Sequence, residues 1–242
     1  MELFLKKSNN IGILIFRGIF ENNSIKTIYY KEIKTESLYE IETSLHYIEN
    51  NLNYSFKSFT IDGRKGVIEL LKRKYPNIPI QLCQYHQKAI IRRYLTLNPK
   101  LECSIELNKL MKNLCLYNKE EFIKEFNNLE NKYKDFLKEK TEIIIELKDY
   151  IKVIKKSYKH KRIRSAIKSL RTNLPYLFTY KEDKYKYLNI PNTTNICEGL
   201  FGSIKPKITI HRGLKINRKK QMFINLLDIK NKTLDIKNSN NR

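Results

Sequence analysis

The spacing of hydrophobic residues changes between strand-like and helix-like several times in the first third of the chain. Residues 11–20 (IGILIFRGIF) are mostly apolar and β-branched, which predicts a strand, and residues 25–33 repeat this pattern after the turn signal Asn22-Asn23-Ser24. We expect these two strands to form a hairpin. Residues 37–51 carry apolar side chains at every third or fourth position, which predicts a helix.

Strand and helix continue to alternate in the next segment. Residues 56–61 form a predicted strand that runs directly into Asp62-Gly63, and residues 67–71 have the apolar spacing of a helix that stops before Pro76. Residues 78–85 return to a strand pattern. The order strand, strand, helix, strand, helix, strand predicts a domain of the α/β class.

The pattern from residue 89 to about residue 180 is helical throughout. Asn118 and Glu121 have the spacing of a capping box, and apolar side chains follow on one face of the helix that they begin. A second apolar stripe at 163–170 predicts another helix, which Pro175 ends. This part of the chain is therefore expected to be a large helical segment.

The remaining residues are a loop, a helix and a polar end. Residues 191–195 predict a loop and helix cap, and residues 196–205 predict a helix. The end of the sequence is rich in Asn and Lys and is expected to be frayed. The chain thus divides into a sheet portion, a helical segment, a second helical part and a flexible tail, at 1–88, 89–190, 191–227 and 228–242.

The charge of the chain is strongly positive and unevenly distributed. The sequence has 48 Lys and Arg against 25 Asp and Glu, a formal net charge of +23. Residues 151–220 hold 19 of these cations and three acids, so this segment contributes +16. Such a concentration indicates a polyanionic partner, above all nucleic acid. The alternative is an AT-rich coding sequence, which raises Lys, Asn and Ile but does not explain the small number of acids.

The cysteine spacing and the hydropathy of the chain indicate its cellular compartment. The four cysteines lack the paired spacing of a disulfide framework, which favours reduced thiols in a cytoplasmic, nucleoid-associated protein. The first ten residues contain no apolar signal region, and the apolar run at 11–16 is too short to cross a bilayer. We expect no membrane role.

Two acids stand out as candidates for metal-dependent chemistry. Asp62 follows a predicted strand, and ligands of open α/β sheets bind beyond the carboxyl ends of strands. Its alternative role is purely structural, because an Asp-Gly turn is common there. Glu198 is the one acid between Asp183 and Asp228, so it is a candidate ligand of Mg²⁺ or the partner of a neighbouring cation in a salt bridge.

Cys83 and His86 form a Cys-x-x-His pair, the spacing of two zinc ligands. A structural zinc site needs four ligands, and no second pair with matching spacing follows. A packing or supporting role near the end of the strand is the favoured interpretation.

A third group of candidates is basic and follows Glu198 in the sequence. These side chains are candidates for contact with DNA phosphates, although a solvated basic surface would have the same composition. They are Lys205, His211, Arg212, Arg218, Lys219 and Lys220.

Three stretches, in this order, resemble the Mutator-like group of DDE transposases encoded by bacterial insertion sequences. They are 59–66 (FTIDGRKG), 79–87 (PIQLCQYHQ) and 194–201 (TNICEGLF), the last followed by Ile204-Lys205 and 211–214 (HRGL). The order and spacing agree with the family, including a helical insertion between the second and third stretches. The likeness covers roughly residues 10–225.

The resemblance implies a fold, a reaction and roles for individual residues. It implies an RNase H-like mixed sheet with a large helical insertion before the last catalytic helix. It implies two divalent metals, Mg²⁺ or Mn²⁺, and phosphoryl transfer on double-stranded DNA by a homo-oligomer. Asp62 matches the second family acid and Glu198 the third, and the Cys83–His86 block would support the site and the DNA.

The sequence departs from the family where the first catalytic aspartate is expected. That residue lies on a strand just before the one predicted at 11–20, and the single acid ahead of this point is Glu2. We therefore expect the first strand to be missing and the catalytic site to be incomplete. Two alternatives remain: an inactive basic DNA-binding remnant that regulates a full-length transposase, and another RNase H-like nuclease.

Overall fold

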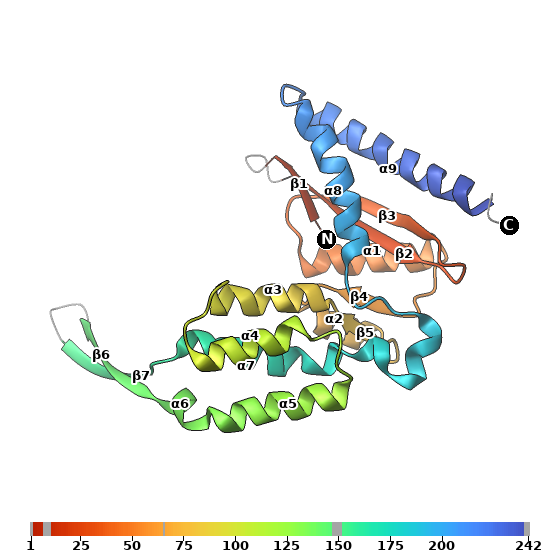
Figure 1. Ribbon diagram of the computed structural model, residues 1–242. Helices are drawn as coiled ribbons and strands as arrows, with labels where there is room; N and C mark the ends of the chain where they lie inside the picture. Colours follow the sequence, from red (N-terminus) through yellow and green to blue (C-terminus); the bar gives the residue numbers. More distant parts are fainter. Residues whose placement is uncertain (1, 7–10, 65, 147–151, 240–242) are drawn as a thin grey trace. The chain divides into compact units, whose positions relative to one another are not determined.

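The computed structural model describes residues 2–6, 11–64, 66–146 and 152–239. The chain is of mixed α/β class, as the hydrophobic pattern predicts. It divides into two compact units, each built from separate segments of the sequence (Figure 1). Unit 1 comprises Met1–Lys57, Arg64–Ile78 and Thr194–Arg242, and unit 2 comprises Ser58–Gly63 and Pro79–Thr193.

In its described residues, unit 1 contains a three-stranded antiparallel sheet and four helices. Its elements are β1 (Glu2–Lys6), β2 (Ile11–Ile19), β3 (Ile25–Ile33), α1 (Leu38–Asn50), α2 (Val67–Lys74), α8 (Asn195–Ile210) and α9 (Ile216–Ser239). The strand order is β1-β2-β3, and the expected β2–β3 hairpin is confirmed.

The structure adds a strand that the sequence analysis did not include. β1 pairs antiparallel with β2, with Glu2 opposite Leu14. A strand therefore precedes β2 in the sheet, contrary to the expectation that the first strand is missing. A run as short as residues 3–5 has too little periodicity to predict a strand. The strand conformation of β1 depends on its pairing with the longer β2.

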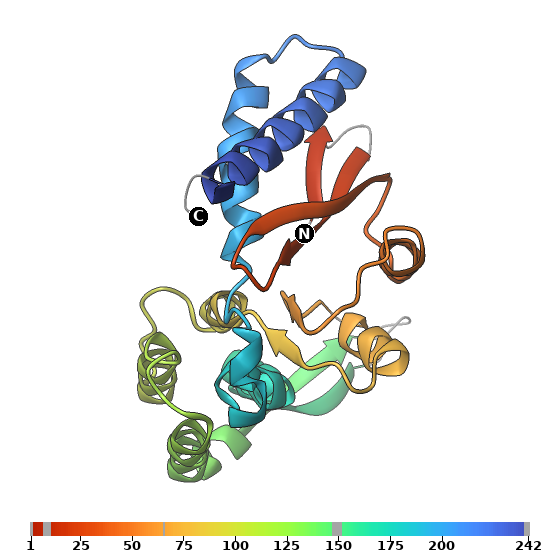
Figure 2. The same ribbon diagram turned by 90° about the vertical axis from the view of Figure 1, so that its right-hand side faces the viewer.

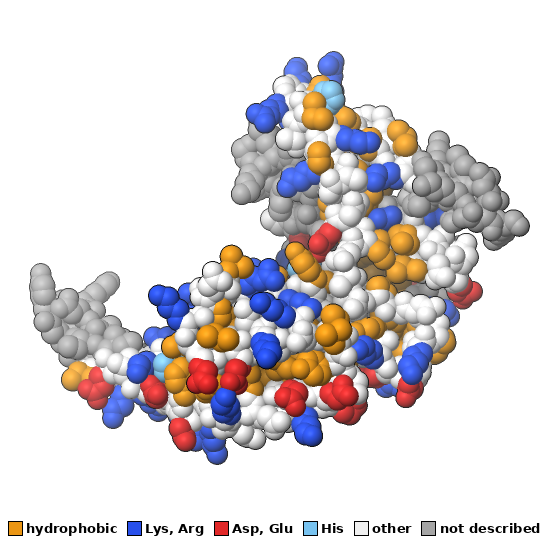
Figure 3. Space-filling view, viewed as in Figure 1, with side chains coloured by type: hydrophobic (Ala, Val, Ile, Leu, Met, Phe, Trp, Pro, Cys, Tyr) orange, Lys and Arg blue, Asp and Glu red, His pale blue; other side chains and the backbone are white. Residues whose placement is uncertain are grey.

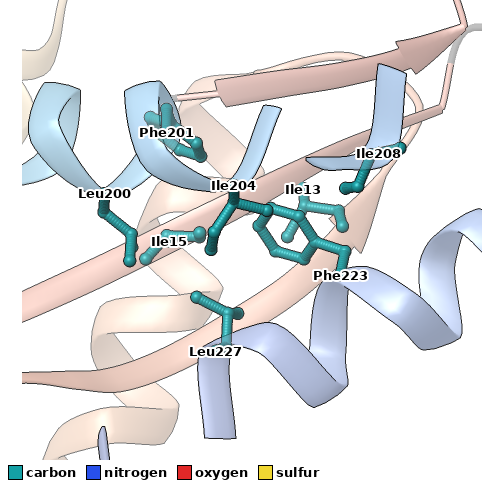
Figure 4. Packing of buried hydrophobic residues seen from close by; sticks show 8 residues of the cluster. All are labelled: Ile13, Ile15, Leu200, Phe201, Ile204, Ile208, Phe223 and Leu227. Atoms are coloured by element: carbon teal, nitrogen blue, oxygen red, sulfur yellow. The ribbon is translucent and has the colours of Figure 1, made fainter. Parts of the chain in front are cut away.

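One face of the unit 1 sheet packs against α8 and α9. In Figure 4, side chains of β2 meet those of the two helices in a continuous apolar layer. Its members are all at most 7% exposed: Ile13, Ile15, Leu200, Phe201, Ile204, Ile208, Phe223 and Leu227. Because successive side chains of a strand point to opposite faces, this layer uses the odd-numbered positions of β2.

The opposite face of the sheet packs against α1. Leu14 is buried there, and Phe16 of the same face contacts Tyr29, whose ring lies 5.0 Å from that of Tyr47 in α1. Figure 2 shows the sheet between α1 on one side and α8 with α9 on the other. Ser37 precedes α1 and caps it, because its side-chain hydroxyl accepts a hydrogen bond from the Glu40 N–H.

α9 is longer than the sequence pattern predicts. The polar residues from 228 onward were expected to be a flexible tail, yet the helix continues to Ser239. Asn231 gives a physical reason, because its side-chain amide pairs with the edge strand β3. Its Nδ2 donates to the carbonyl of Thr27 (3.2 Å), and its Oδ1 accepts from the Thr27 N–H (3.1 Å). A polar side chain thus holds the helix to the sheet.

The described part of unit 2 contains a parallel strand pair, five α-helices and an antiparallel hairpin. Its strands are β4 (Phe59–Ile61), β5 (Ile80–Leu82), β6 (Lys140–Glu146) and β7 (Lys152–Tyr158). Its α-helices are α3 (Gln84–Leu95), α4 (Glu102–Lys112), α5 (Lys119–Lys132), α6 (Lys134–Lys138) and α7 (Lys161–Asn173). Three short 3₁₀ turns follow: η3 (Leu174–Tyr176), η4 (Thr179–Lys181) and η5 (Asp183–Leu188).

Two helices of unit 2 match their predicted positions. Asn118 accepts from the Glu121 N–H (2.8 Å), and the Glu121 carboxylate accepts from the Asn118 N–H (3.1 Å), which is the expected capping box of α5. The apolar stripe at 163–170 is buried in α7, and this helix ends before Pro175.

The hairpin β6–β7 corrects the prediction of an entirely helical segment between residues 89 and 180. Its strands pair from Lys140 with Tyr158 to Glu146 with Lys152. The run of three isoleucines at 143–145 has the β-branched character that favours strands. Within the described ranges, none of the helices combines the length and apolar character needed to span a bilayer.

Candidate functional site

Asp62 directly follows β4, as the sequence predicts. β4 and β5 are parallel, and the Cys83 N–H donates to the carbonyl of Ile61 (2.7 Å). Asp62 and Cys83 therefore leave the sheet at the same carboxyl edge. The next residue, Gly63, has a φ of +84°, a conformation that glycine adopts readily and that turns the chain sharply away. The turn and a ligand role are compatible, because the turn holds Asp62 at the strand end.

The Cys83–His86 block joins β5 to α3. Cys83 is 1% exposed, and His86 lies in the first turn of α3 with its ring 6.0 Å from that of Tyr85 in an edge-to-face arrangement. Among the described residues, no group of three or more His, Cys, Asp and Glu is placed to hold a metal ion.

Two buried glutamines, which the sequence analysis did not single out, fix the segments around this edge. Gln81 donates to the carbonyl of Leu177 (3.0 Å) and accepts from the Tyr180 N–H (3.0 Å). Gln84 also donates to Leu177 (2.9 Å), and its backbone N–H donates to the carbonyl of Asn192 (2.9 Å). A glutamine inside an otherwise apolar strand is a signal that could have identified Gln81, because buried amides need partners.

Glu198 lies in the first turn of α8 and is half-buried. A carboxylate at this position interacts favourably with the positive end of the helix. Arg17 of β2 reaches the same turn, where its Nη1 donates to the carbonyl of Ile196 (2.8 Å). Glu198 belongs to unit 1 and Asp62 to unit 2, so the structure places the two candidate acids in different compact units.

The predicted DNA-contacting residues all lie on α8, on α9 or in the turn between them. Lys205, His211, Arg212 and Arg218 are exposed, and Figure 3 shows cations and a histidine at this end of unit 1. The two remaining residues are half-buried and form local contacts. Lys219 donates to the carbonyl of Arg212 (3.1 Å), and Lys220 forms an ion pair with Glu32 (2.6 Å). Lys205, Arg212 and Arg218 therefore offer the more accessible charges.

A further group of cations in unit 1 was not predicted. Lys230 of α9 donates to the hydroxyl of Ser203 in α8. Burial lowers the pKa of Lys230, and the nearby charges of Lys207 and Arg17 lower it further. Burial likewise lowers the pKa of Arg17, against an opposing effect of Cys197. These cations come from β2, α8 and α9, so the sequence gives no local signal of the positive field that they create.

Comparison with known proteins adds no family to these observations. No protein-family model matches the chain, and no curated protein matches it.

Proposed function

We propose that this chain is the catalytic portion of a DDE-type transposase, which binds DNA and acts on it by metal-dependent phosphoryl transfer. The observation that carries the proposal is the position of Asp62 at the carboxyl edge of the parallel pair β4–β5. The element order supports it: three antiparallel strands, a helix, β4, a helix, β5, an insertion, and then α8 with Glu198. This is the order expected of an RNase H-like domain with a helical insertion.

The candidate acids suit the metal ions that such a reaction uses. Mg²⁺ and Mn²⁺ prefer oxygen ligands, and Asp62 and Glu198 would supply carboxylate oxygens. Bound metal would stabilise the attacking and leaving oxygens of the phosphodiester. In this proposal Gln81 and Gln84 hold the Asp62 edge in position, while the exposed cations of α8 and α9 bind phosphates.

The first acid of the family has no aspartate counterpart here. β1 stands ahead of β2 in the sheet, and its one acid is Glu2. We therefore propose an incomplete site, with nicking of DNA stronger than strand transfer. As in the family, the active form would be a homo-oligomer that acts on paired ends.

The test is a nicking assay on DNA that contains the ends of the element, with Mg²⁺ or Mn²⁺ and with EDTA as the metal-free control. Asp62→Asn and Glu198→Gln keep the side-chain size and should each remove the metal-dependent product. Asp183→Asn is the matched control, because Asp183 is an exposed acid on η5 paired with Lys186. Nicking that survives both Asp62→Asn and Glu198→Gln would contradict the proposal.

A second candidate function is DNA binding without catalysis. In that case the chain would be an inactive remnant that regulates a full-length transposase. The net charge of +23 and the cation group formed by Arg17, Lys207 and Lys230 favour it. Its signature is DNA binding that survives Asp62→Asn and Glu198→Gln, with no cleavage under either metal. Cleavage without preference for end sequences would instead indicate an RNase H-like nuclease.

A further inference from the structure

Unit 2 contains an open groove with a volume of about 620 Å³, which we call the basic groove. It lies where the end of α3, the start of α4 and the start of α7 meet the base of the β6–β7 hairpin. Its lining includes Tyr94, Thr96, Lys100, Tyr158, Lys161 and Arg162. None of the candidate residues discussed above lines it.

The charge of the groove is positive. No acid is found among the described residues that line it. One of its lysines, Lys159, is neutralised by Glu139 at 3.0 Å, whereas no ion pair within the described part of the chain involves Lys100, Lys161 or Arg162. Arg162 is held at the groove because its Nη2 donates to the carbonyl of Arg93 (2.8 Å). Three cations from one helix and a loop therefore line one hollow with no ion-pair partner among the described residues.

The start of α7 strengthens this field. Lys161 and Arg162 lie in its first turn, Arg164 follows, and no acid is present there. Cations at this end oppose the helix macrodipole, so the arrangement costs stability in the free chain. An anion bound in the groove would interact favourably with these cations and with the positive end of α7, and so offset the loss of stability. Figure 3 shows Lys and Arg side chains also gathered over neighbouring α3 on the face in view.

Backbone strain marks the same place. Thr96, which lines the groove, has a φ of +71° and a ψ of 173°, a conformation that β-branched residues rarely adopt. Strain of this kind costs on the order of 1–3 kcal/mol and is concentrated at functional sites. A β-branched residue is thus kept in an unfavourable conformation where the uncompensated cations meet.

We propose that the basic groove binds the sugar-phosphate backbone of DNA, as a contact separate from the α8–α9 cations. The identification of the polyanion as DNA rests on the proposed function. Cations on α7 and on the segment before α4 are spread across a hollow of several hundred Å³, which suits successive phosphates of a strand better than one small anion. Such contacts fix the position of DNA without reading its sequence.

The test measures binding of the full chain to a labelled DNA duplex over a range of salt concentrations, in EDTA so that no cleavage occurs. The variant Lys100→Ala/Lys161→Ala/Arg162→Ala should lose roughly tenfold to a hundredfold in affinity on DNA of any sequence. Because each lost phosphate contact removes about 0.9 from the slope of log affinity against log salt, that slope should fall by about 2 to 3.

The matched control removes three positive charges elsewhere in unit 2. Lys124, Lys134 and Lys138 are exposed on α5 and α6 and do not line the groove. Their triple alanine variant should bind nearly as tightly as the unchanged chain. Equal losses in both triple variants would reduce the effect to net charge and overturn the proposal, as would unchanged binding by the groove variant.

A second variant covers the possibility that Arg162→Ala disturbs folding. Lys100→Glu/Lys161→Glu reverses two exposed charges and leaves the Arg162–Arg93 hydrogen bond intact. It should weaken binding at least as much as the triple alanine variant. The outcome is independent of the catalytic proposal, because Asp62→Asn abolishes nicking but leaves binding in EDTA unchanged if both proposals hold. A failed nicking assay with groove-dependent binding would reject the transposase activity alone.

Discussion

Different kinds of contact surround the sheet of unit 1 and the parallel strand pair of unit 2. The centre of unit 1 is apolar, and its members come from distant parts of the chain: Ile13 and Ile15 of β2 pack with Phe223 and Leu227 of α9. The strand pair of unit 2 is instead bordered by buried polar side chains. Gln81 is fully buried and hydrogen-bonds to segments almost 100 residues further along the sequence.

The difference lies in what each kind of contact specifies. Apolar packing is non-directional, so it favours burial and close packing of whichever surfaces fit. Hydrogen bonds from buried amides have fixed directions and are costly to leave unmade. The Gln81 and Gln84 amides therefore fix the backbone at Leu177 and Asn192 relative to β5, beside the edge where Asp62 leaves the sheet.

The largest effect on stability is expected in the apolar layer of unit 1. Phe223 is fully buried between β2 and α8, so Phe223→Ala should cost about 3–5 kcal/mol of stability in unit 1. Hydrogen exchange followed by mass spectrometry should show faster exchange in β2 and α8 and unchanged exchange in α5. Phe223→Leu, which keeps most of the apolar volume, should have a much smaller effect. Equally faster exchange in α5 would show that the two units unfold together.

Sequence prediction succeeded for features that depend on local sequence alone. α1 and α5 were predicted because the apolar spacing of both helices and the Asn118 cap of α5 are local properties. The position of Asp62 was predicted for the same reason, since it depends on one strand and its end. β1 was missed because its pairing with β2, rather than its own short sequence, makes it a strand.

Features that depend on tertiary neighbours could not be predicted. The positive field around Lys230 arises from residues of β2 and α8 that are far away in the sequence. The contact between Asn231 of α9 and Thr27 of β3 joins residues far apart in the sequence and exists only in the folded chain. Likewise, no local pattern could show that Asp62 and Glu198 fall into different compact units.

The second largest effect on stability is expected at the buried Gln81 side chain. Gln81→Leu leaves the half-buried Tyr180 N–H without its acceptor, and we expect a loss of stability of about 1–3 kcal/mol. Gln81→Glu keeps that acceptor but brings a carboxylate oxygen near the carbonyls of Leu82 and Leu177. It should therefore be more harmful at neutral pH and recover partly when acid protonates it. Denaturant unfolding at two pH values measures both, and a harmless Gln81→Leu would show that the network contributes little.

A smaller effect of opposite sign is expected at Thr96. Glycine adopts a positive φ without the Cβ strain of threonine, so Thr96→Gly should stabilise unit 2 by about 1 kcal/mol. Thr96→Ala retains a Cβ and serves as the control, with little or no gain expected. Thermal unfolding measures the difference. A loss of stability in Thr96→Gly would mean that contacts of the threonine side chain outweigh the strain.

The smallest effect is expected at the base of the hairpin, where polar contacts are exposed rather than buried. A hydrogen bond from Lys159, and a second from His160, lower the pKa of Glu139 below its ordinary value. A carboxyl whose pKa is lowered by folding adds stability above its unfolded pKa, and this contribution disappears as the pH falls through the folded pKa. Glu139→Gln should therefore speed hydrogen exchange slightly in the described ends of β6 and β7 at neutral pH. The difference should vanish in acid and shrink with added salt, because the pair is exposed. An exchange difference that persists in acid would assign the effect to packing of the Glu139 side chain instead of its charge.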